Sequence, residues 1–517
     1  MDRPAVTPVL PSAEWLDAPP PTVPALAPSP AQPPHPGPAR VILHVLIALF
    51  SLFLIVRTVA LEPFGVPTGS MAPAFLGNHR EAACDRCGDR VVVGEPGPDA
   101  RAVRFDQCKC PNCGAAVDLS GAKEIPGDRL MVDKTAFVNR HPRRWEIAVF
   151  HCPADDTKPY VKRVVGLPRE LVRIADGDFY ANGEIQRKTL VQVRETRVLV
   201  FDMNAAPADG WGLRFRAEPI GDPRRPARSD EVAEKPLPAG TLEGNSLHLS
   251  ESPEGTRAIT YRHWNPETKQ AEPVGDWLAY NGAPAARRGT FARKLPENVA
   301  DPVHDFLLEF DLEVQSDPGL FACRLGDGAD TVRAELPFGT NREFAIRHDG
   351  GPDEKVTTGT FLKPGNTHRI EFAFVDRRAS LAIDGVEVVS HLNLPPLPIG
   401  PLRKGVARPF QLGLRGGSAV VRNLKLYRDI HYTLVPKTPA EWRLGIDEYF
   451  LLGDNSTNSH DSRSWEVDGV RTPGVPERAF IGKPFLIHQP LKLSRTKVNG
   501  SDRTIQTLDW SRLRWLR

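Results

Sequence analysis

Two residues in this chain, a serine and a lysine, stand in surroundings that suit nucleophilic chemistry. Ser70 lies in EPFGVPTGSMAP, from Glu62 to Pro73, directly after an apolar segment. Lys162 lies among β-branched residues in YVKRVVGLP, from Tyr160 to Pro168. A serine hydroxyl needs a neighbouring base, and a lysine serves as that base only where apolar surroundings lower its pKa. The two segments therefore predict a serine nucleophile activated by a lysine.

A third segment makes this pair more specific. Ser70 alone is typical of an ordinary loop serine, and Lys162 alone is typical of a strand lysine whose amine reaches solvent. The third stretch is YFLLGDNSTNSHDSRSW, from Tyr449 to Trp465. Together, the three segments closely resemble the signal peptidase I family of membrane-bound Ser/Lys proteases.

The resemblance implies a role for each residue of the predicted dyad and for its neighbours. Ser70 matches the family's nucleophile, and Lys162 matches its general base. Thr68 matches the hydroxyl residue that helps to form the oxyanion hole, while Ser459 matches the serine that orients the lysine. The implied substrates are the signal peptides of exported pre-proteins, and no cofactor takes part in the chemistry.

Further positions match the surroundings of the site. Three match supporting polar residues: Asp454, Asp461 and Arg463. Four match positions that shape shallow substrate pockets: Val66, Met71, Phe75 and Val161. Ser456 departs from the family's pattern, since an arginine is common there. The ion pair that this arginine makes is therefore not expected here.

These residues need a β-rich core to position them. Other matches to the family lie at Gly127 to Phe137, Trp145 to Phe150 and Ile174 to Glu184. The last also predicts strands joined by tight hairpins, because Asp176-Gly177 and Asn182-Gly183 supply the positive φ that such turns require. The resemblance covers roughly residues 40–190 and 440–490, with an interruption in the first block.

An apolar segment precedes the serine motif. The uncharged run from Val41 to Val56 continues after Arg57 as far as Leu61, which is long enough for a helix that crosses a bilayer. A cleaved signal peptide is the alternative, because Thr58-Val59-Ala60 loosely resembles a cleavage site. Flanking charge does not decide the orientation, since Arg57 nearly balances Arg40. The resemblance implies a single-pass inner-membrane protein with a cytoplasmic N-terminus and a catalytic domain on the outer face.

Composition limits the other partners. Lys and Arg total 66 against 64 acidic residues, so the net charge of +2 does not indicate a nucleic-acid binder. The first 39 residues are rich in Pro and Ala, a composition that cannot bury a core. We predict a disordered tail there.

Four cysteines form two paired motifs, Cys84-x2-Cys87 and Cys110-x2-Cys113. The spacing between the pairs is close to that of zinc ribbons, in which four thiolates hold a structural ion and leave no open coordination position. Cys108 is an additional candidate ligand. Disulfides are the alternative, since an exported compartment favours them. Two further cysteines, Cys152 and Cys323, are predicted to be small buried apolar residues.

The long middle segment predicts a β-sandwich. Phe306 to Val314, FLLEFDLEV, alternates apolar and acidic residues, as a half-buried antiparallel strand does. Other strands are predicted at 368–375, 379–383, 385–389 and 419–427, and no helical period competes. The pattern weakly resembles concanavalin-like, laminin-G-type jelly rolls. Such domains often bind carbohydrates or peptides, and a spacer or shielding role is an equal alternative here.

The predicted fold is mainly β: a signal-peptidase-type β catalytic core, one N-terminal transmembrane helix, an inserted β-sandwich and a small zinc-ribbon-like insert. The predicted boundaries are 1–39 for the tail, 40–61 for the membrane helix, 62–76, 126–190 and 439–517 for the core with its C-terminal tail, 77–125 for the cysteine insert and 191–438 for the sandwich.

The predicted function is that of a membrane-bound serine endopeptidase that cleaves signal peptides, with the lipid bilayer as a second partner. One alternative is an inactive, membrane-tethered binding protein that uses the sandwich. A second is a self-cleaving transcriptional regulator, which shares the Ser/Lys dyad. That class needs a DNA-binding head, and this chain has a Pro-rich tail and an apolar segment instead.

Overall fold

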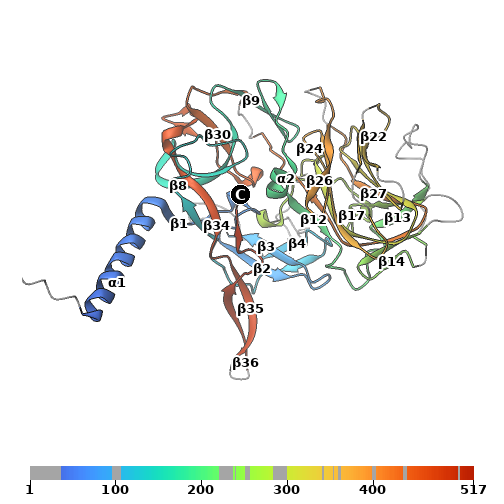
Figure 1. The fold of residues 1–517 in the computed structure, drawn as a ribbon, viewed down its shortest axis with the longest axis horizontal. Helices are drawn as coiled ribbons and strands as arrows, with labels where there is room; N and C mark the ends of the chain where they lie inside the picture. The colour runs from blue at the N-terminus through green and yellow to red at the C-terminus, as the bar shows by residue number, and fades with distance from the viewer. Residues whose placement is uncertain are drawn as a thin grey trace, which may run out of the picture. The chain divides into compact units, whose positions relative to one another are not determined.

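The computed structural model describes most of the chain (Figure 1). The described residues are 37–95, 106–219, 237–238, 240–250, 257–282, 300–339, 343–352, 354–358, 362–398, 403–434, 439, 441–498 and 501–516. The predicted disordered tail, 1–39, lies outside the described residues except for its last three positions. Residues 57–517 form one compact unit, and the N-terminal segment up to Val56 is a separate one.

The N-terminal unit contains the apolar helix α1 (Pro38–Ile55), which continues as a short π-helical turn, η1 (Val56–Ala60). Within the described part of the chain, this is the one helix long and apolar enough to cross a membrane. The helix expected at 40–61 begins two residues earlier, at Pro38, and its last expected residue, Leu61, already begins strand β1.

An antiparallel sheet of eight strands forms the predicted catalytic core. Its order is β1-β6-β34-β7-β8-β30-β33, and β37 pairs with β34. The strands are β1 (Leu61–Gly65), β6 (Arg129–Asp133), β34 (Phe480–Ile487), β7 (Ile147–Cys152), β8 (Asp155–Gly166), β30 (Glu448–Leu452), β33 (Val475–Pro476) and β37 (Arg514–Trp515). The sheet thus joins segments from both ends of the chain.

A second core sheet contains the two predicted hairpins. Its order is β11-β10-β9-β29, formed by β11 (Glu184–Ile185), β10 (Asp178–Ala181), β9 (Leu171–Ala175) and β29 (Glu441–Arg443). The turn residues Asp176, Gly177, Asn182 and Gly183 all have positive φ, between 50° and 88°. The prediction from these two dipeptides is confirmed.

The middle segment forms two large antiparallel sheets. One has the order β14-β15-β28-β19-β24-β25-β26, with β12 also paired to β28, and the other has the order β13-β16-β27-β20-β21-β22-β23. The first contains β12 (Val198–Asp202), β14 (Leu242–Glu243), β15 (Ser246–Ser250), β19 (Phe306–Ser316), β24 (Thr367–Val375), β25 (Arg378–Ile383), β26 (Val386–Asn393) and β28 (Ser418–Arg428). The second contains β13 (Phe215–Pro219), β16 (Arg257–Tyr261), β20 (Gly319–Gly326), β21 (Thr331–Phe338), β22 (Glu343–His348), β23 (Glu354–Thr358) and β27 (Phe410–Arg415).

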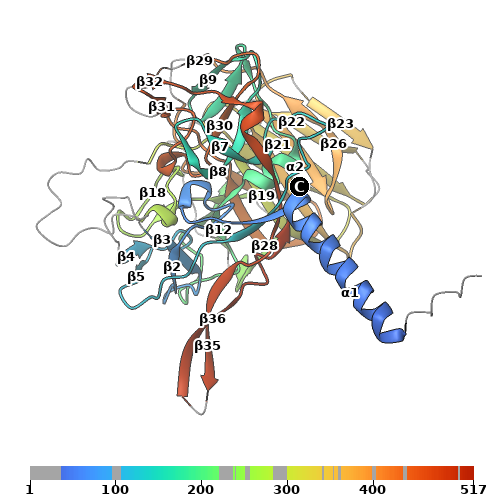
Figure 2. The same ribbon diagram turned by 90° about the vertical axis from the view of Figure 1, so that its left-hand side faces the viewer.

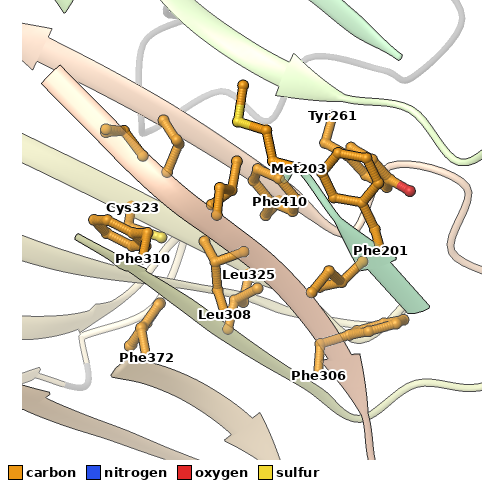
Figure 3. Close-up of a cluster of buried hydrophobic side chains, with 14 of the residues drawn as sticks. Phe201, Met203, Tyr261, Phe306, Leu308, Phe310, Cys323, Leu325, Phe372 and Phe410 are labelled. Carbon is orange, nitrogen blue, oxygen red and sulfur yellow. The ribbon is translucent and has the colours of Figure 1, made fainter. Parts of the chain in front are cut away.

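Side chains from both large sheets share one hydrophobic core. Figure 3 shows Phe306, Leu308 and Phe310 of β19 beside Cys323 and Leu325 of β20 in this cluster. The buried Cys323 and Cys152 confirm the prediction for these two thiols. The strands predicted from alternation are also confirmed, within one or two residues at most ends. β26 is the exception, since it extends four residues beyond its predicted end.

The acidic face of β19 is more covered than a half-buried strand predicts. β19 is a central strand, paired with β24 and β28. Glu309 is only 9% exposed, and it forms ion pairs with Arg197 and Arg369. Charged neighbours therefore compensate for the burial of this carboxylate.

One short helix, α2 (Leu190–Thr196), differs from the expectation that the middle segment contains no helix. A capping box begins it, since the Thr189 side chain accepts from the Gln192 backbone while the Gln192 side chain accepts from Thr189 N. The helix buries Leu190 and Val193 against the sandwich. A Thr-x-x-Gln pattern is the sequence signal for this start.

Two small hairpins carry the cysteines, β2 (His79–Ala83) with β3 (Arg90–Gly94) and β4 (Gln107–Lys109) with β5 (Ala116–Asp118). Near the C-terminus, β35 (Leu491–Val498) and β36 (Ser501–Leu508) form a two-stranded ribbon. Figures 1 and 2 both show this ribbon projecting from the rest of the 57–517 unit.

Candidate active site

Ser70 lies in a single 3₁₀ turn, η2 (Gly69–Met71), which follows β1. The turn continues into a buried segment, where Met71 and Phe75 are fully buried and Phe75 N donates to Met71 O at 3.0 Å. Ser70 itself is partly exposed. The buried Met71 and Phe75 side chains therefore anchor the turn in the core, while Ser70 lies at the surface of the core.

Lys162 lies on β8, opposite Ala148 of β7. Its side chain is only 3% exposed, and its Nζ donates a hydrogen bond to Ser70 Oγ at 2.6 Å. The two candidate catalytic groups are therefore in direct contact, at the distance that proton transfer requires.

Burial lowers the pKa of Lys162 to about 8, despite two nearby carboxylates. Desolvation of the ammonium is the largest effect, and the negative charges of Asp461 and Asp454 oppose it. Because the loss of hydration outweighs this attraction, a substantial fraction of the amine is neutral near pH 8. A neutral amine beside a hydroxyl can act as a general base.

The third segment packs directly on the serine turn. Strand β30 pairs with β8 next to the lysine, with Leu452 opposite Arg163. The following residues reach Ser70, since Asn455 N donates to Ser70 O at 3.0 Å. Gly453 is needed for this approach, because a Cβ there would lie 2.4 Å from Ser70 O.

Ser459 and Thr68 lie at the site without the contacts that their predicted roles imply. The Ser459 Oγ is buried, and among the described residues it has no hydrogen-bond partner, Lys162 included. Thr68 is exposed at the start of η2, and its side chain makes no capping bond within this described turn. Their roles as orienting residue and oxyanion donor stay predictions.

The supporting polar residues form two buried ion pairs. Asp454 accepts from Arg163 Nε and Nη2 at 2.8 and 2.6 Å. Asp461 accepts from Arg463 at 2.8 and 2.7 Å, and also from Gly453 N at 3.0 Å. The first pair joins the third segment to strand β8, which carries the lysine, whereas the second pair lies within the third segment.

Two polar residues of this network were not assigned roles from the sequence. Arg163 pairs with Asp454 although it lies in an apolar strand, and a buried arginine is a signal for a buried carboxylate partner. At the departing position, Ser456 Oγ accepts from Arg463 Nη1 at 2.8 Å. The hydroxyl therefore interacts with the Asp461–Arg463 pair where an arginine is common.

The four predicted substrate-pocket residues lie in one cluster. Val66, Met71 and Phe75 are buried together, and Val161 packs against them. The structure thus gathers these side chains beside the serine turn and on the strand of the lysine. Their role in binding a substrate is a prediction.

The cysteine motifs bring four thiols together. Cys84 Sγ lies 3.5 Å from Cys113 Sγ, and Cys87 Sγ lies 3.7 Å from Cys110 Sγ. All four sulfur atoms lie within 4.8 Å of one another, and none is in a disulfide. Cys108 is not in this group, since its Sγ donates to backbone oxygens, including Ala279 O at 3.6 Å. The prediction of Cys108 as an additional ligand is therefore wrong in this structure.

The arrangement of the four cysteine thiols fits a tetrahedrally coordinated metal ion. Zn–S bonds of about 2.3 Å place sulfur atoms about 3.8 Å apart, close to the two distances above. Both motifs form the same turn, in which Gly88 N donates to Cys84 O and Gly114 N donates to Cys110 O, with φ of +74° and +80°. These residues could hold one structural zinc ion.

The comparisons with known proteins match one segment of the chain, around Lys162. The sequence pattern of the family described as "Signal peptidase, peptidase S26" matches residues 120–219. Lys162 lies inside the matched segment, and Ser70 lies outside it. Relatives are called signal peptidase I in Pseudomonas fluorescens, with 28% identity over 26% of this chain, and in Pseudomonas aeruginosa, with 29% identity over 27%.

One segment of this chain is thus similar to the signal peptidase S26 family. The alignments span about a third of the length of these relatives, 34% and 37%. The family match therefore includes the segment around Lys162 and leaves Ser70 and the third segment outside it.

Solved structures of low similarity overlap with part of the chain. The carbohydrate-binding module CBM66 from Bacillus subtilis covers 35% of this chain and 94% of its own length, with 12% identity and a TM-score of 0.19. Sheep galectin-11 covers 24% and 90%, with 13% identity and a TM-score of 0.18. TM-scores this low assign neither a fold nor a ligand to the sandwich.

Proposed function

We propose that the protein is a membrane-anchored serine endopeptidase that removes signal peptides from exported pre-proteins. The observation that carries this proposal is the 2.6 Å contact between the buried Lys162 Nζ and Ser70 Oγ. The match of residues 120–219 to the signal peptidase S26 family supports the substrate class.

The chemistry follows from this contact. Neutral Lys162 takes the Ser70 proton as Oγ attacks the scissile carbonyl, and the carbonyl oxygen becomes an oxyanion. The Ser70 backbone N–H and the Thr68 hydroxyl are the candidate donors for this oxyanion. The Lys162 ammonium then protonates the leaving amine of the substrate. The Lys162 amine, neutral again, activates the water that hydrolyses the acyl-enzyme.

The proposed setting is the inner membrane. Helix α1 supplies a single anchor, with the N-terminus cytoplasmic and the catalytic core on the outer face, by resemblance to the family. The substrate then emerges from the bilayer at the surface where Ser70 acts. It would lie extended beside Val66, Met71, Phe75 and Val161, with small residues facing the shallow pockets.

Catalysis in this proposal uses no cofactor. A zinc ion held by Cys84, Cys87, Cys110 and Cys113 would be structural, since four protein ligands leave no open coordination position. A carbohydrate or peptide ligand of the sandwich stays a prediction.

Three substitutions test the dyad. We expect Ser70→Ala and Lys162→Ala to lower cleavage of a model pre-protein by at least about 10³-fold with the fold retained, because nucleophile or base is lost. Lys162→Arg should fail as well, since a guanidinium does not release its proton. The measurement is cleavage by the purified full chain in detergent.

Lys158→Ala is the matched control, since this exposed lysine lies on the same strand, β8. It should cleave at the wild-type rate. A purified Lys162→Ala protein that cleaves at that rate would eliminate the proposed mechanism. A wild-type chain without activity that still binds a ligand through the sandwich would favour the tethered binding protein instead.

A further inference from the structure

A short segment of the middle insert packs on the serine turn, although the two are about two hundred residues apart in the sequence. The segment is the 3₁₀ turn η3 (Ala279–Asn281). The residues just before it are hydrogen-bonded to the sandwich: Val274 N donates to Val406 O, and Arg428 Nη2 donates to Asp276 O. The insert thus extends a fixed arm to the candidate active site.

Asn281 forms a reciprocal amide pair with Asn455. Asn281 Nδ2 donates to Asn455 Oδ1 at 2.8 Å, and Asn455 Nδ2 donates to Asn281 Oδ1 at 2.6 Å. Asn281 also contacts Thr457 Oγ1 at 3.1 Å and Asn458 Nδ2 at 3.3 Å. Since Asn455 is fully buried, this pair defines the orientation of its side chain.

Asn455 in turn holds the peptide group that carries the proposed oxyanion donor. Its Nδ2 donates to Gly69 O at 2.9 Å, and its backbone N donates to Ser70 O at 3.0 Å. Gly69 C=O and Ser70 N–H belong to one trans peptide plane and point in opposite directions. A bond that fixes Gly69 O therefore fixes the direction of Ser70 N–H.

Tyr280 fixes the same peptide from another side. Its ring packs so closely on Gly69 that a Cβ there would lie 1.9 Å from Tyr280 Cε1, and a Cβ on Gly94 would lie 2.3 Å from the same atom. Its hydroxyl donates to Asn78 O at 3.1 Å. The ring is 7% exposed and fills the space between the serine turn and strand β3.

We infer that Tyr280 and Asn281 are positioning residues that the insert supplies to the active site, where they align the Ser70 N–H toward the oxyanion. This inference rests on the proposed function. It makes the insert a component of the catalytic apparatus rather than a spacer, because the core's own Asn455 is oriented by a residue from the insert.

The test uses Asn281→Ala and Tyr280→Ala in the full chain, with cleavage of a model signal peptide as the first readout. We expect kcat to fall about 10- to 100-fold while KM changes less than about twofold, because a misaligned donor acts on the transition state. Tyr280→Phe, which keeps the ring on Gly69, should lower kcat less than Tyr280→Ala does. Asn245→Ala is the control, since this amide bonds to Asn204 O on the exposed surface of the insert.

A second readout separates alignment from general loosening of the fold. A peptide aldehyde of the substrate sequence accepts Ser70 Oγ at its carbonyl carbon, the serine proton passes to Lys162, and the former carbonyl oxygen carries the negative charge. Asn281→Ala should weaken binding of this aldehyde by the same factor as kcat/KM. Binding of the corresponding uncleaved peptide to a Ser70→Ala background should not change.

The outcomes distinguish this inference from the proposed function. If Ser70→Ala and Lys162→Ala retain activity, the proposed function fails. If those two variants lose activity while Asn281→Ala and Tyr280→Ala keep wild-type kcat and aldehyde affinity, only the positioning role is overturned. Equal losses of aldehyde and uncleaved-peptide binding would also overturn it, since they would indicate a damaged fold.

Discussion

At the residue scale, the site depends on which of two opposing effects controls the amine of Lys162. Asp461 and Asp454 favour its charged form, yet each is already paired with an arginine. Their attraction is therefore partly neutralised, and desolvation prevails. The two ion pairs thus stabilise the third segment without converting the lysine into a permanent ammonium.

The lowered pKa of Lys162 gives a pH profile. Below about pH 8 the amine is protonated in the folded protein, so kcat/KM should fall about tenfold for each pH unit. Above that pH it should level off, because the base is fully neutral. Initial rates between pH 6 and 10 measure this profile. A rate that is constant from pH 6 to 9 would contradict the assignment of Lys162 as the base.

Prediction from sequence worked best for residues that lie in a recognisable motif. Ser70 and Lys162 were predicted from their neighbours together with the resemblance of three segments to a known family, and the structure places them in contact. Asn281 was not predicted, since its role depends on Asn455, which lies in a different segment of the chain. A lone asparagine in an insert carries no local signal of such a partner.

At the scale of elements, the cysteine hairpins follow from short-range rules. Each Cys-x-x-Cys-Gly turn needs a glycine with positive φ after the second cysteine, at Gly88 and Gly114. Positive φ also occurs at both residues of the Asp384-Gly385 turn between β25 and β26. Helix α2 was missed because seven residues are too few to show a helical period.

The cluster of four cysteine thiols should bind one zinc ion per chain. We expect Cys87→Ser to abolish stoichiometric zinc and to lower the Tm, because the cysteine hairpins are short and the metal links them. Metal content by mass spectrometry and thermal unfolding measure these effects. Cys108→Ala, whose thiol lies outside the group, should retain the metal. A wild-type protein purified without zinc and with unreactive thiols would instead support disulfides.

At the scale of the whole molecule, buried charges join the catalytic core to the sandwich. Arg403 bonds to Asp176 at 2.6 Å and to Asp178 at 3.0 Å. Lys188 forms ion pairs with Asp376 and with Asp429. These contacts explain why residues 57–517 form one compact unit rather than a protease with a separate appended domain.

This junction predicts a pH-dependent stability. Burial raises the pKa of Asp178 to about 7, and Arg403 only partly opposes it. The folded state then holds a proton that the unfolded state releases above about pH 4. The resulting stabilisation is complete below pH 4 and disappears as the pH rises through 7. Lowering the pH from 8 to 5 should therefore raise the Tm of the wild type relative to that of Asp178→Asn.

Differential scanning calorimetry of the two proteins at pH 5, 6, 7 and 8 gives this comparison. A difference in Tm that does not vary with pH would show that Asp178 does not titrate in this range. The junction itself could not be predicted from sequence, because its charges come from five separated segments and each alone resembles an ordinary surface residue.

The strand order of the catalytic sheet bears on how the protein is made. Strand β34, which begins at Phe480, lies between β6 and β7, and β30 covers the other edge of β8. A ribosome that has finished Ser70 and Lys162 must still synthesise some three hundred residues before either strand emerges. A nascent chain therefore carries Ser70 and Lys162 before it has the strands that complete their sheet, so we expect the two side chains to come into contact only after the C-terminal segment has left the ribosome.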